Sequence, residues 1–431
     1  MTYGEAVARL LALRGGEIGG MRPGLERIEA LLEALGHPER GFQIVQVGGT
    51  NGKGSTSAMI AAILAAAGRR VGLYTSPHLC SFRERIRVNG ALIPESDVVD
   101  GVEAIGTLIA RLDATMFEAV TALALDHFAR ASVDVAVLEV GLGGRLDATT
   151  VGRPAVEVIT RIDYDHQAYL GATLPQIAAE KAAIIRSGVA LAARQEPPVE
   201  AVLLRRAAEV GVPLLLEGRE LTVTVQGWSL EGQRLDLAGP GWRLEDVPCA
   251  LLGVHQAGNA LLAATAARAL AVEDAAILAG LEAVRWPGRF QILDRDPVLI
   301  VDGAHNPGGA RALAGSLRAY FPGQPVTFVV GISADKDAAG VLDALLPLAL
   351  RVICTASSNP RAASPSSLRA LRPDDPRIET AGSPAEALAQ AMGPPRPPII
   401  CVAGSLFLVG EVLAQHPEKA VILGGPAQGC C

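Results

Sequence analysis

A β-branched run, a glycine-rich turn and a long alanine-rich segment follow one another near the N-terminus, and they constrain the fold most. Residues 42–48 read FQIVQVG, a strand pattern, and residues 54–68 read GSTSAMIAAILAAAG, a helix pattern that ends at Gly68. The amides at the start of such a helix attract anions, and the helix dipole adds to the attraction. The order strand, glycine turn and helix therefore predicts a phosphate-binding loop.

The loop departs from the common pattern G-x-x-x-x-G-K-[ST]. Val47 stands where that pattern has its first glycine, and Gly54 stands where it has a hydroxyl residue, with Ser55 one step later. A damaged site, a chance run of glycines with an exposed lysine, and a different class of phosphate loop are the three interpretations. The strand and helix context favours the last, with Lys53 near the β- and γ-phosphates and Ser55 near Mg²⁺. The residues expected to bind ATP here are Gly49, Thr50, Asn51, Gly52, Lys53, Gly54 and Ser55.

Further strands and helices alternate along the chain. Residues 70–76, 133–141 and 155–162 are predicted as strands, and residues 95–110 and 116–131 as helices. This alternation predicts an α/β fold with a doubly wound, mainly parallel sheet. Short glycine-rich strands between Pro213 and Pro248 are expected to add a small antiparallel sheet at one edge.

The sequence RWPGR at residues 285–289 follows a predicted helix pair and reads as a linker. Beyond it, PVLIVDGAHNP, PVTFVVGI, LRVICTAS and PPIICVAGS alternate with helical patterns. We therefore expect a domain at residues 1–286 and a smaller Rossmann-like α/β domain at residues 287–431.

Composition excludes several classes of protein. A net charge of -7 argues against general nucleic-acid binding, and no run of about 20 apolar residues predicts a membrane span. The six cysteines form no C-x-x-C, which favours a reduced, cytoplasmic protein, and no signal peptide is expected. Cys430 and Cys431 are expected to lie in an exposed tail.

Four longer stretches carry a family resemblance: residues 75–90, TSPHLCSFRERIRVNG; 138–149, LEVGLGGRLDAT; 165–185, DHQAYLGATLPQIAAEKAAII; and 301–309, VDGAHNPGG. Shorter matches are GVHQAGNA, WPGRF, ADKD and VAGSLFLVGEV. In this order they resemble the folylpolyglutamate synthase and dihydrofolate synthase branch of the Mur ligase superfamily. The cell-wall Mur ligases typically carry Thr or Ser after the loop lysine, so Gly54 is similar to the folate branch instead.

The resemblance implies a Mg²⁺ site at Ser76, Glu139 and His166. From the residues alone, Glu139 ends a buried strand, where its carboxylate needs a cation or hydrogen-bond donors. His166 alone reads as a loop histidine and Ser76 as a turn residue. Lys181 alone reads as a helix lysine paired with Glu180 or solvent, whereas the resemblance makes it a carbamylated lysine, which requires a neutral amine.

The resemblance also places a pterin pocket on this chain. Its residues are Thr115, Met116, Phe117, Glu118, Leu146, Asp147 and Ala148. Phe117 alone reads as core, although a ring can stack on a pteridine. Thr150 departs from the family, which usually has Asn after DAT. Residues 21–28 (MRPGLERI) weakly resemble a folate-contact segment. Arg83 and Arg85 are expected either to meet acidic substrate groups or to be solvated.

Residues of the far domain, together with Asn259 of the first domain and Arg289 at the linker, are expected to complete the nucleotide site. Asn259 resembles the adenine-side residue, Arg289 the arginine that reaches the ATP phosphates, and Asp302 and His305 the residues that contact ribose and phosphates. A hinge at residues 286–289 would close the two domains and exclude water.

The reaction implied by the family is amide ligation. A pterin-linked carboxylate takes the γ-phosphate of ATP, and L-glutamate attacks the acyl phosphate, giving ADP and phosphate. Four catalytic residues (Lys53, Glu139, His166 and Lys181), two Mg²⁺ ions, a carbamate and a monomer are implied, with a monovalent cation left open. The sequence leaves open whether dihydropteroate, reduced folate or both are accepted.

Three other functions compete with this one. A cell-wall type ligase is disfavoured by Gly54 and by LEVGLGGRLDAT. A nucleotide switch or binding module would leave Glu139, His166 and the distant Asp302 motif unexplained. A dehydrogenase would require G-x-G-x-x-G with a trailing acid, which the loop lacks.

Overall fold

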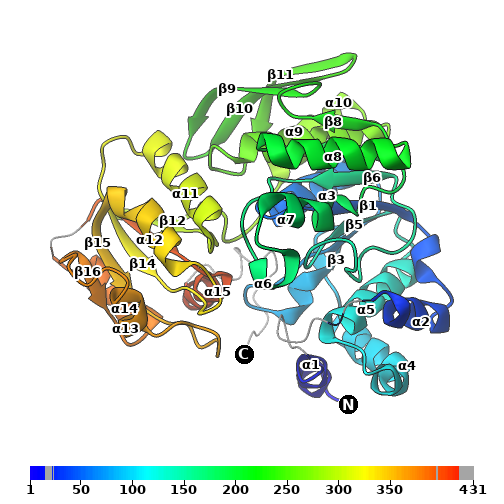
Figure 1. Ribbon diagram of the computed structural model, residues 1–431, viewed down its shortest axis with the longest axis horizontal. Coiled ribbons are helices and arrows are strands. Elements are labelled where there is room, and N and C mark those ends of the chain that lie inside the picture. The colour runs from blue at the N-terminus through cyan, green and yellow to red at the C-terminus, as the bar shows by residue number, and fades with distance from the viewer. Residues whose placement is uncertain (15–21, 23, 395–396, 417–431) are drawn as a thin grey trace.

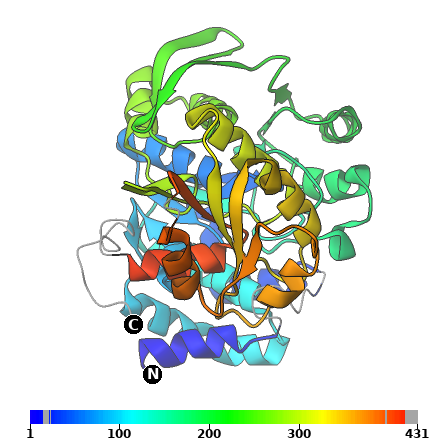
Figure 2. The same cartoon turned by 90° about the vertical axis from the view of Figure 1, so that its left-hand side faces the viewer.

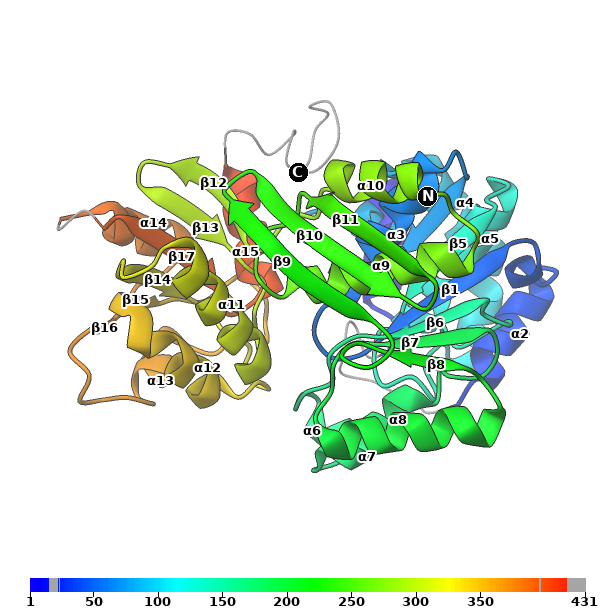
Figure 3. The same ribbon diagram turned by 90° about the horizontal axis from the view of Figure 1, so that it is seen from above.

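A computed structural model describes residues 1–14, 22, 24–394 and 397–416 of the chain. The polypeptide forms an N-terminal part around a large sheet and a C-terminal part around a smaller sheet (Figure 1). A three-stranded sheet, β9–β11, extends from the N-terminal part toward the C-terminal part, as the view from above shows (Figure 3). The predicted α/β fold with a mainly parallel sheet, a small antiparallel sheet and a second α/β unit is confirmed.

The main sheet has eight strands in the order β4-β3-β2-β5-β1-β6-β7-β8. Six of them run parallel, whereas β3 and β4 form an antiparallel edge. Their bounds are β1 Gln43–Gly48, β2 Val71–Tyr74, β3 Ile86–Val88, β4 Ala91–Leu92, β5 Val135–Glu139, β6 Val156–Ile159, β7 Val189–Ala192 and β8 Leu214–Leu216. In this register Val47 lies between Glu139 and Val158, so the carboxyl ends of the central strands meet beside the glycine loop.

Helix α3 (Lys53–Ala66) is apolar around its circumference, as expected for a helix buried on every side. It packs in one core cluster with β1, β5 and β6, and with α9 (Gln256–Ala269) and α10 (Asp274–Ala283). A second cluster joins the sheet to the N-terminal helices. The other helices of this part are α1 Tyr3–Leu11, α2 Glu26–Ala34, α4 Glu95–Leu112, α5 Met116–Arg130, α6 Gln167–Leu170, α7 Leu174–Ala182 and α8 Pro197–Val210, with 3-10 turns η1 Pro38–Arg40 and η2 Phe82–Arg85.

The small antiparallel sheet is separate from the main one. The strands β9 (Thr222–Ser229), β10 (Gly232–Gly239) and β11 (Trp242–Cys249) pair only with each other, so the expectation that they add to an edge of the main sheet is wrong. Strand β8 takes that edge and runs parallel to β7. The reason is packing, because one face of β9–β11 supplies apolar side chains to the core that contains α9.

The C-terminal sheet has the order β12-β13-β17-β14-β15-β16, with only β12 antiparallel. Its strands are β12 Gln291–Arg295, β13 Val298–Val301, β14 Val326–Val330, β15 Ala349–Cys354, β16 Ile378–Thr380 and β17 Ile399–Ala403. Its helices are α11 Pro307–Tyr320, α12 Ala338–Leu345, α13 Pro365–Arg369, α14 Pro384–Met392 and α15 Leu406–Gln415, with η3 at Leu346–Leu348. Helices cover the sheet, as the side view of this part shows (Figure 2).

Among the described residues, no helix is long and apolar enough to cross a bilayer. The expectations for Met21, Pro23, Cys430 and Cys431 lie outside the described residues.

Candidate active site

A cavity of about 310 Å³ lies where the two parts meet. It brings together the glycine loop, the ends of β2 and β5, the start of α5, and loops of the C-terminal part. The expected site residues that line it are Thr50, Asn51, Gly52, Lys53, Gly54, Ser55, Ser76, Thr115, Met116, Phe117, Glu118, Glu139, Leu146, Asp147, Ala148, His166, Lys181, Arg289, Asp302 and His305. Gly49 and Asn259 are not among the lining residues.

The glycine loop requires its glycines. Gly49 and Gly52 have φ angles of 129° and 96°, which L side chains rarely adopt. A Cβ at Gly52 would lie 2.6 Å from Asn259 Oδ1, so Asn259 supports the loop from behind. Helix α3 begins at Lys53 without a side-chain cap, which leaves its first amides available for an anion.

Gly54 has a structural reason that is invisible in the sequence. A Cβ at this position would lie 3.1 Å from Nε1 of Trp286, the tryptophan of the linker. The Arg87 guanidinium also lies over the indole, with its Cζ 5.9 Å from the ring centroid. The linker therefore packs directly on the loop, and a larger residue after Lys53 would displace it.

Glu139 ends β5 and lies almost buried in the cavity wall. Its carboxylate accepts a hydrogen bond of 3.1 Å from the Ser76 backbone N–H. Burial raises the pKa of Glu139, and the nearby Lys53, Arg289 and Arg85 oppose that rise. The carboxylate thus lies in a cationic wall that also suits phosphate groups.

The donor set at Ser76, Glu139 and His166 fits Mg²⁺ in a limited way. One hydroxyl, one carboxylate and one imidazole leave most of an octahedral shell to phosphate oxygens and water. In the part of the chain that the structure describes, no group of three or more His, Cys, Asp or Glu side chains is arranged to hold a metal ion by itself. Burial, with the charges of Lys336 and Lys53, lowers the pKa of His166 to about 4, so its imidazole is neutral, as a metal ligand must be.

Lys181 on α7 is buried, and its Nζ donates to the Gly49 carbonyl oxygen at 2.8 Å. Burial and the neighbouring charge of Lys53 lower the pKa of Lys181 to about 7. A substantial neutral fraction follows at physiological pH, which is the form that reacts with CO₂. Glu180, considered above as its partner, instead pairs with Arg145 at 3.1 Å.

The expected pterin residues form the other end of the cavity. The Phe117 ring fills the space beside Gly141, where a Cβ would lie 2.5 Å from Cζ, and it lies 5.8 Å from the Tyr74 ring. Thr115 caps α5 in a capping box with Glu118. The Glu118 carboxylate also accepts a hydrogen bond of 3.0 Å from Arg27 Nε.

Asp147 holds its own loop together. Its carboxylate accepts from the backbone N–H groups of Leu142 at 2.8 Å and Thr149 at 3.0 Å. Thr150 donates to the Gly144 carbonyl oxygen at 2.7 Å and accepts from Gln46 Nε2, and it is not a lining residue. The departure at Thr150 therefore lies in the support of this loop.

Arg83 and Arg85, which were expected either to meet substrate or to be solvated, lie in different environments. Arg85 is almost fully buried and lines the cavity, with its Nε 2.9 Å from His78 Nδ1. Arg83 donates from Nε to the Ile93 carbonyl oxygen at 2.6 Å and is not a lining residue.

The C-terminal residues are positioned by backbone contacts. Asp302 accepts from the N–H groups of Phe290 at 2.7 Å and Ala304 at 2.8 Å. His305 Nδ1 contacts the Gly303 carbonyl oxygen at 2.8 Å, and its Nε2 lies 3.5 Å from Asp165 Oδ2. Burial lowers the pKa of Arg289, and Asp302 and Glu139 oppose that change.

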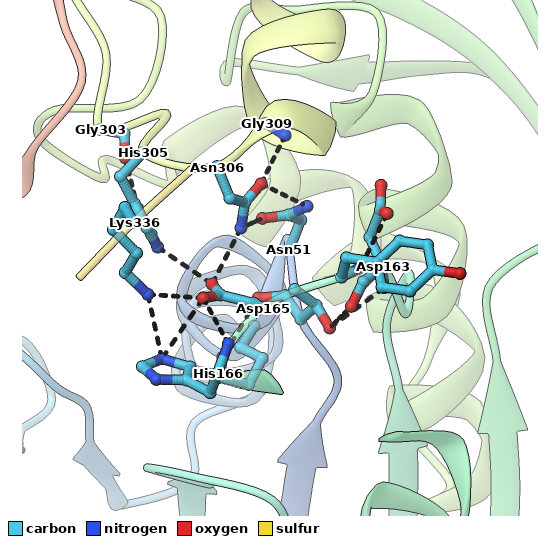
Figure 4. A network of polar contacts seen from close by, with 12 residues as sticks. Asn51, Asp163, Asp165, His166, Gly303, His305, Asn306, Gly309 and Lys336 are labelled. Carbon is cyan, nitrogen blue, oxygen red and sulfur yellow. Dashed lines mark hydrogen bonds and ion pairs between the residues drawn. The ribbon is translucent and has the colours of Figure 1, made fainter. Parts of the chain in front are cut away.

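Three residues for which no role was expected join the two parts: Asp165, Asn306 and Lys336 (Figure 4). Lys336 Nζ lies 2.5 Å from Asp165 Oδ1 and 3.2 Å from His166 Nε2. Although burial favours protonation, the hydrogen bond from His305 and the charge of Lys336 hold the pKa of Asp165 well below its usual range. The motifs DHQ, AHNP and ADKD contain these residues, but only the fold shows that they meet.

Comparison with known families and proteins agrees with this geometry. The Mur ligase middle domain matches residues 47–267, and the Mur ligase glutamate ligase domain matches residues 288–406. The folylpolyglutamate synthase of Lacticaseibacillus casei is 35% identical over 99% of this chain and 100% of its own length. A Halobacterium salinarum protein named as a probable bifunctional folylpolyglutamate synthase/dihydropteroate synthase is 39% identical over 95% of this chain, which spans 51% of that relative.

Solved structures show the same fold. The Mycobacterium tuberculosis folylpolyglutamate synthase complexed with ADP and AMPPCP has a TM-score of 0.89 at 35% identity, covering 99% of this chain and 100% of that one. The Escherichia coli protein FolC in complex with DHPP and ADP has a TM-score of 0.88 at 33% identity, covering 96% and 97%. The chain therefore belongs to the folylpolyglutamate synthase and dihydrofolate synthase branch of the Mur ligase family.

Proposed function

We propose that this protein is an ATP-dependent ligase that adds L-glutamate to a pterin-linked carboxylate, either dihydropteroate or a reduced folate. One observation carries the proposal: a single cavity joins a phosphate-type loop at Lys53, a carboxylate in a cationic wall at Glu139, and an apolar end at Phe117. A nucleotide switch needs only the first of these features. The relatives named for both activities support the same chemistry.

The chain's residues suit activation of a carboxylate by phosphoryl transfer. Lys53 and the free amides at the start of α3 orient the γ-phosphate of ATP and offset its charge. The acceptor carboxylate attacks phosphorus, the bond to ADP breaks, and an acyl phosphate forms. The amine of glutamate then attacks the acyl carbon, loses a proton, and expels phosphate, giving the amide.

Mg²⁺ bound by Ser76, Glu139 and His166 would supply charge neutralisation for the phosphates. We propose a second Mg²⁺ near His166 and a carbamate on Lys181, which the depressed pKa and the contact with Gly49 support. We also propose a monovalent cation as a further ligand of this site. Arg289, Asp302 and His305 hold the nucleotide from the C-terminal side, with Asn259 behind the loop toward the base.

We further propose a domain boundary between residues 286 and 287, with a hinge at residues 286–289. The sheets on either side are separate, and the linker tryptophan packs on the loop, which supports this division. Closure would exclude water from the acyl phosphate. A cytoplasmic monomer without nucleic-acid or membrane partners remains our proposal, supported by the net charge of -7 and by the reduced thiols of Cys249, Cys354 and Cys401.

The test is glutamate-dependent release of phosphate from ATP, with dihydropteroate and tetrahydrofolate compared as acceptors. Turnover with one or both acceptors is expected, and it also decides between one activity and two. The Lys53→Ala variant should lose this turnover while keeping its unfolding midpoint, since Lys53 is only partly buried. If neither acceptor supports phosphate release, the assignment is refuted. Substantial turnover by Lys53→Ala would also refute it.

A further inference from the structure

The side chain of Asn306 occupies an unusual position at the junction of the two parts. It is 2% exposed and lies at the N-cap of α11, where Oδ1 accepts a hydrogen bond of 2.8 Å from the Gly309 N–H. The same amide also contacts Asn51 and Asp165 of the N-terminal part (Figure 4). An N-cap needs only the first of these contacts.

Three further hydrogen bonds use the remaining capacity of the amide. Asn51 Nδ2 donates to Asn306 Oδ1 at 3.2 Å, and Asn306 Nδ2 donates back to Asn51 Oδ1 at 3.1 Å. Asn306 Nδ2 also donates to Asp165 Oδ2 at 3.0 Å. Asn51 belongs to the glycine loop, and Asp165 precedes His166. One buried amide therefore joins the nucleotide loop, the metal-side loop and the C-terminal part.

The backbone of α11 approaches just as closely. A Cβ on Gly308 would overlap Asp163 Oδ2 and lie 3.0 Å from Asn51 Nδ2. Arg311, one turn farther along α11, pairs with Asp163 at 2.9 Å. The start of this helix is therefore fitted to the N-terminal part at a position where only glycine leaves room.

We propose that Asn306 is a positioning residue whose amide holds the C-terminal part closed on the nucleotide loop before any substrate binds. We call Asn51, Asp165 and Asn306 the closure contact. Asn51 lies at the phosphate end of the cavity and Asp165 at the metal end. The closure contact therefore aligns these two ends of the cavity with Asp302 and His305 of the C-terminal part. Its catalytic consequence rests on the ligase activity proposed above, whereas the closed arrangement of the ligand-free protein does not.

Two substitutions separate the closure contact from the helix cap. Asn, Asp and Ser are comparable N-caps, so Asn306→Ser and Asn306→Asp both keep the bond to Gly309. Ser cannot span the contact, and Asp replaces the donor 3.0 Å from Asp165 with a second carboxylate. Gly308→Ala is a third probe, because alanine favours the helix but places a methyl group against Asp163 and Asn51.

The matched control is Ser383→Asp. Ser383 caps α14 by accepting from the Glu386 N–H at 3.2 Å, and it is not a lining residue of the cavity. Like Asn306→Asp, this substitution adds one negative charge at the N-cap of a helix in the C-terminal part, but it does not touch the closure contact.

The measurements are the radius of gyration of the ligand-free protein by small-angle X-ray scattering, the unfolding midpoint, and the kinetics of glutamate-dependent ADP formation. Loss of the three hydrogen bonds to the N-terminal part in Asn306→Ser should lower the equilibrium constant for closure at least about tenfold, and kcat/KM for the acceptor should fall with the closed fraction. Asn306→Asp and Gly308→Ala should lower it at least as far. All three should enlarge the radius of gyration at an unchanged unfolding midpoint, and Ser383→Asp should match the unmodified protein.

The opposite results are equally definite. A wild-type radius of gyration and wild-type kcat/KM in both Asn306 variants would overturn the proposal. So would an activity loss that follows a lowered unfolding midpoint at an unchanged radius of gyration, since that outcome assigns Asn306 to the helix cap alone. If the unmodified protein turns over no acceptor, the proposed ligase activity fails, and the scattering data still decide the closure contact.

Discussion

Gly54→Thr is the substitution that tests most directly why this loop differs from the cell-wall type. A Cβ at Gly54 would lie 3.1 Å from Trp286 Nε1 and 3.4 Å from its Cζ2. For Gly54→Ala the indole needs to move by only a few tenths of an ångström, and alanine's helix propensity offsets part of the cost. Threonine adds two further heavy atoms beside an indole that also carries the Arg87 guanidinium on its ring.

Overpacking of this kind costs about 1–3 kcal/mol. Because Trp286 and Arg289 belong to one short linker, the displacement should appear in ATP-dependent turnover as a fall of about five- to 150-fold in kcat/KM for ATP. Gly54→Ala should stay within about threefold of the unmodified protein, since its cost is a fraction of that of threonine. Glutamate-dependent ADP formation at varied ATP concentration measures both.

A double-mutant cycle with Trp286→Ala isolates the contact. If the indole is the obstacle, Gly54→Thr should cost much less in the Trp286→Ala background than in the unmodified protein. Equal costs in the two backgrounds would refute this reasoning, as would wild-type kinetics of Gly54→Thr. The unfolding midpoints of the four proteins serve as the control for folding.

Three further outcomes follow from buried charge and from the metal site. The folded-state pKa of the Lys181 amine without its carbamate is about 7, below its ordinary value of 10.5, so the unfolded chain binds more protons between these pH values. The stability of the uncarbamylated protein relative to Lys181→Met should therefore rise by up to about 1.4 kcal/mol per pH unit in that window. Urea midpoints of the two proteins that change in parallel between pH 7.5 and 9 would contradict this. Arg27→Met leaves the buried Glu118 carboxylate without its cation and should destabilise by about 3–5 kcal/mol, with Arg27→Met/Glu118→Gln recovering much of the loss in thermal unfolding. Chelation by EDTA should abolish turnover reversibly but leave the unfolding midpoint of the nucleotide-free protein unchanged, because few protein groups would hold Mg²⁺; a large shift without nucleotide would point to a resident structural ion.

The elements of the fold could be predicted wherever a local pattern carries them. The strand at residues 43–48, the helix at 53–66 and the alternation that follows depend on periodicity within a few residues. The separate β9–β11 sheet could not be predicted in the same way. Whether a polar-apolar strand pairs with a sheet edge or packs its face on a helix depends on a surface formed far away in the sequence.

In the candidate site, too, some features could be predicted from the sequence and others only from the structure. The residue types at Lys53, Glu139 and Lys181, with the family resemblance, were enough to propose roles for them, and the cavity brings these residues together. Those roles stay predictions until activity is measured. The environments came only from the structure: the bond from Lys181 to Gly49, the occupation of Asp147 by its own loop, and the burial of Arg85.

The sequence by itself determined that a strand, a glycine loop and a helix form a phosphate-type site, because that geometry depends on backbone freedom at Gly49 and Gly52 and on a helix N-terminus. Only the tertiary structure decided why Gly54 is glycine and what Asn51 contacts. Trp286 and Asn306 are each more than 200 residues away in the chain. Local dihedral preferences act over a few residues, whereas steric fit and hydrogen-bond pairing depend on which distant segments the packed core brings together.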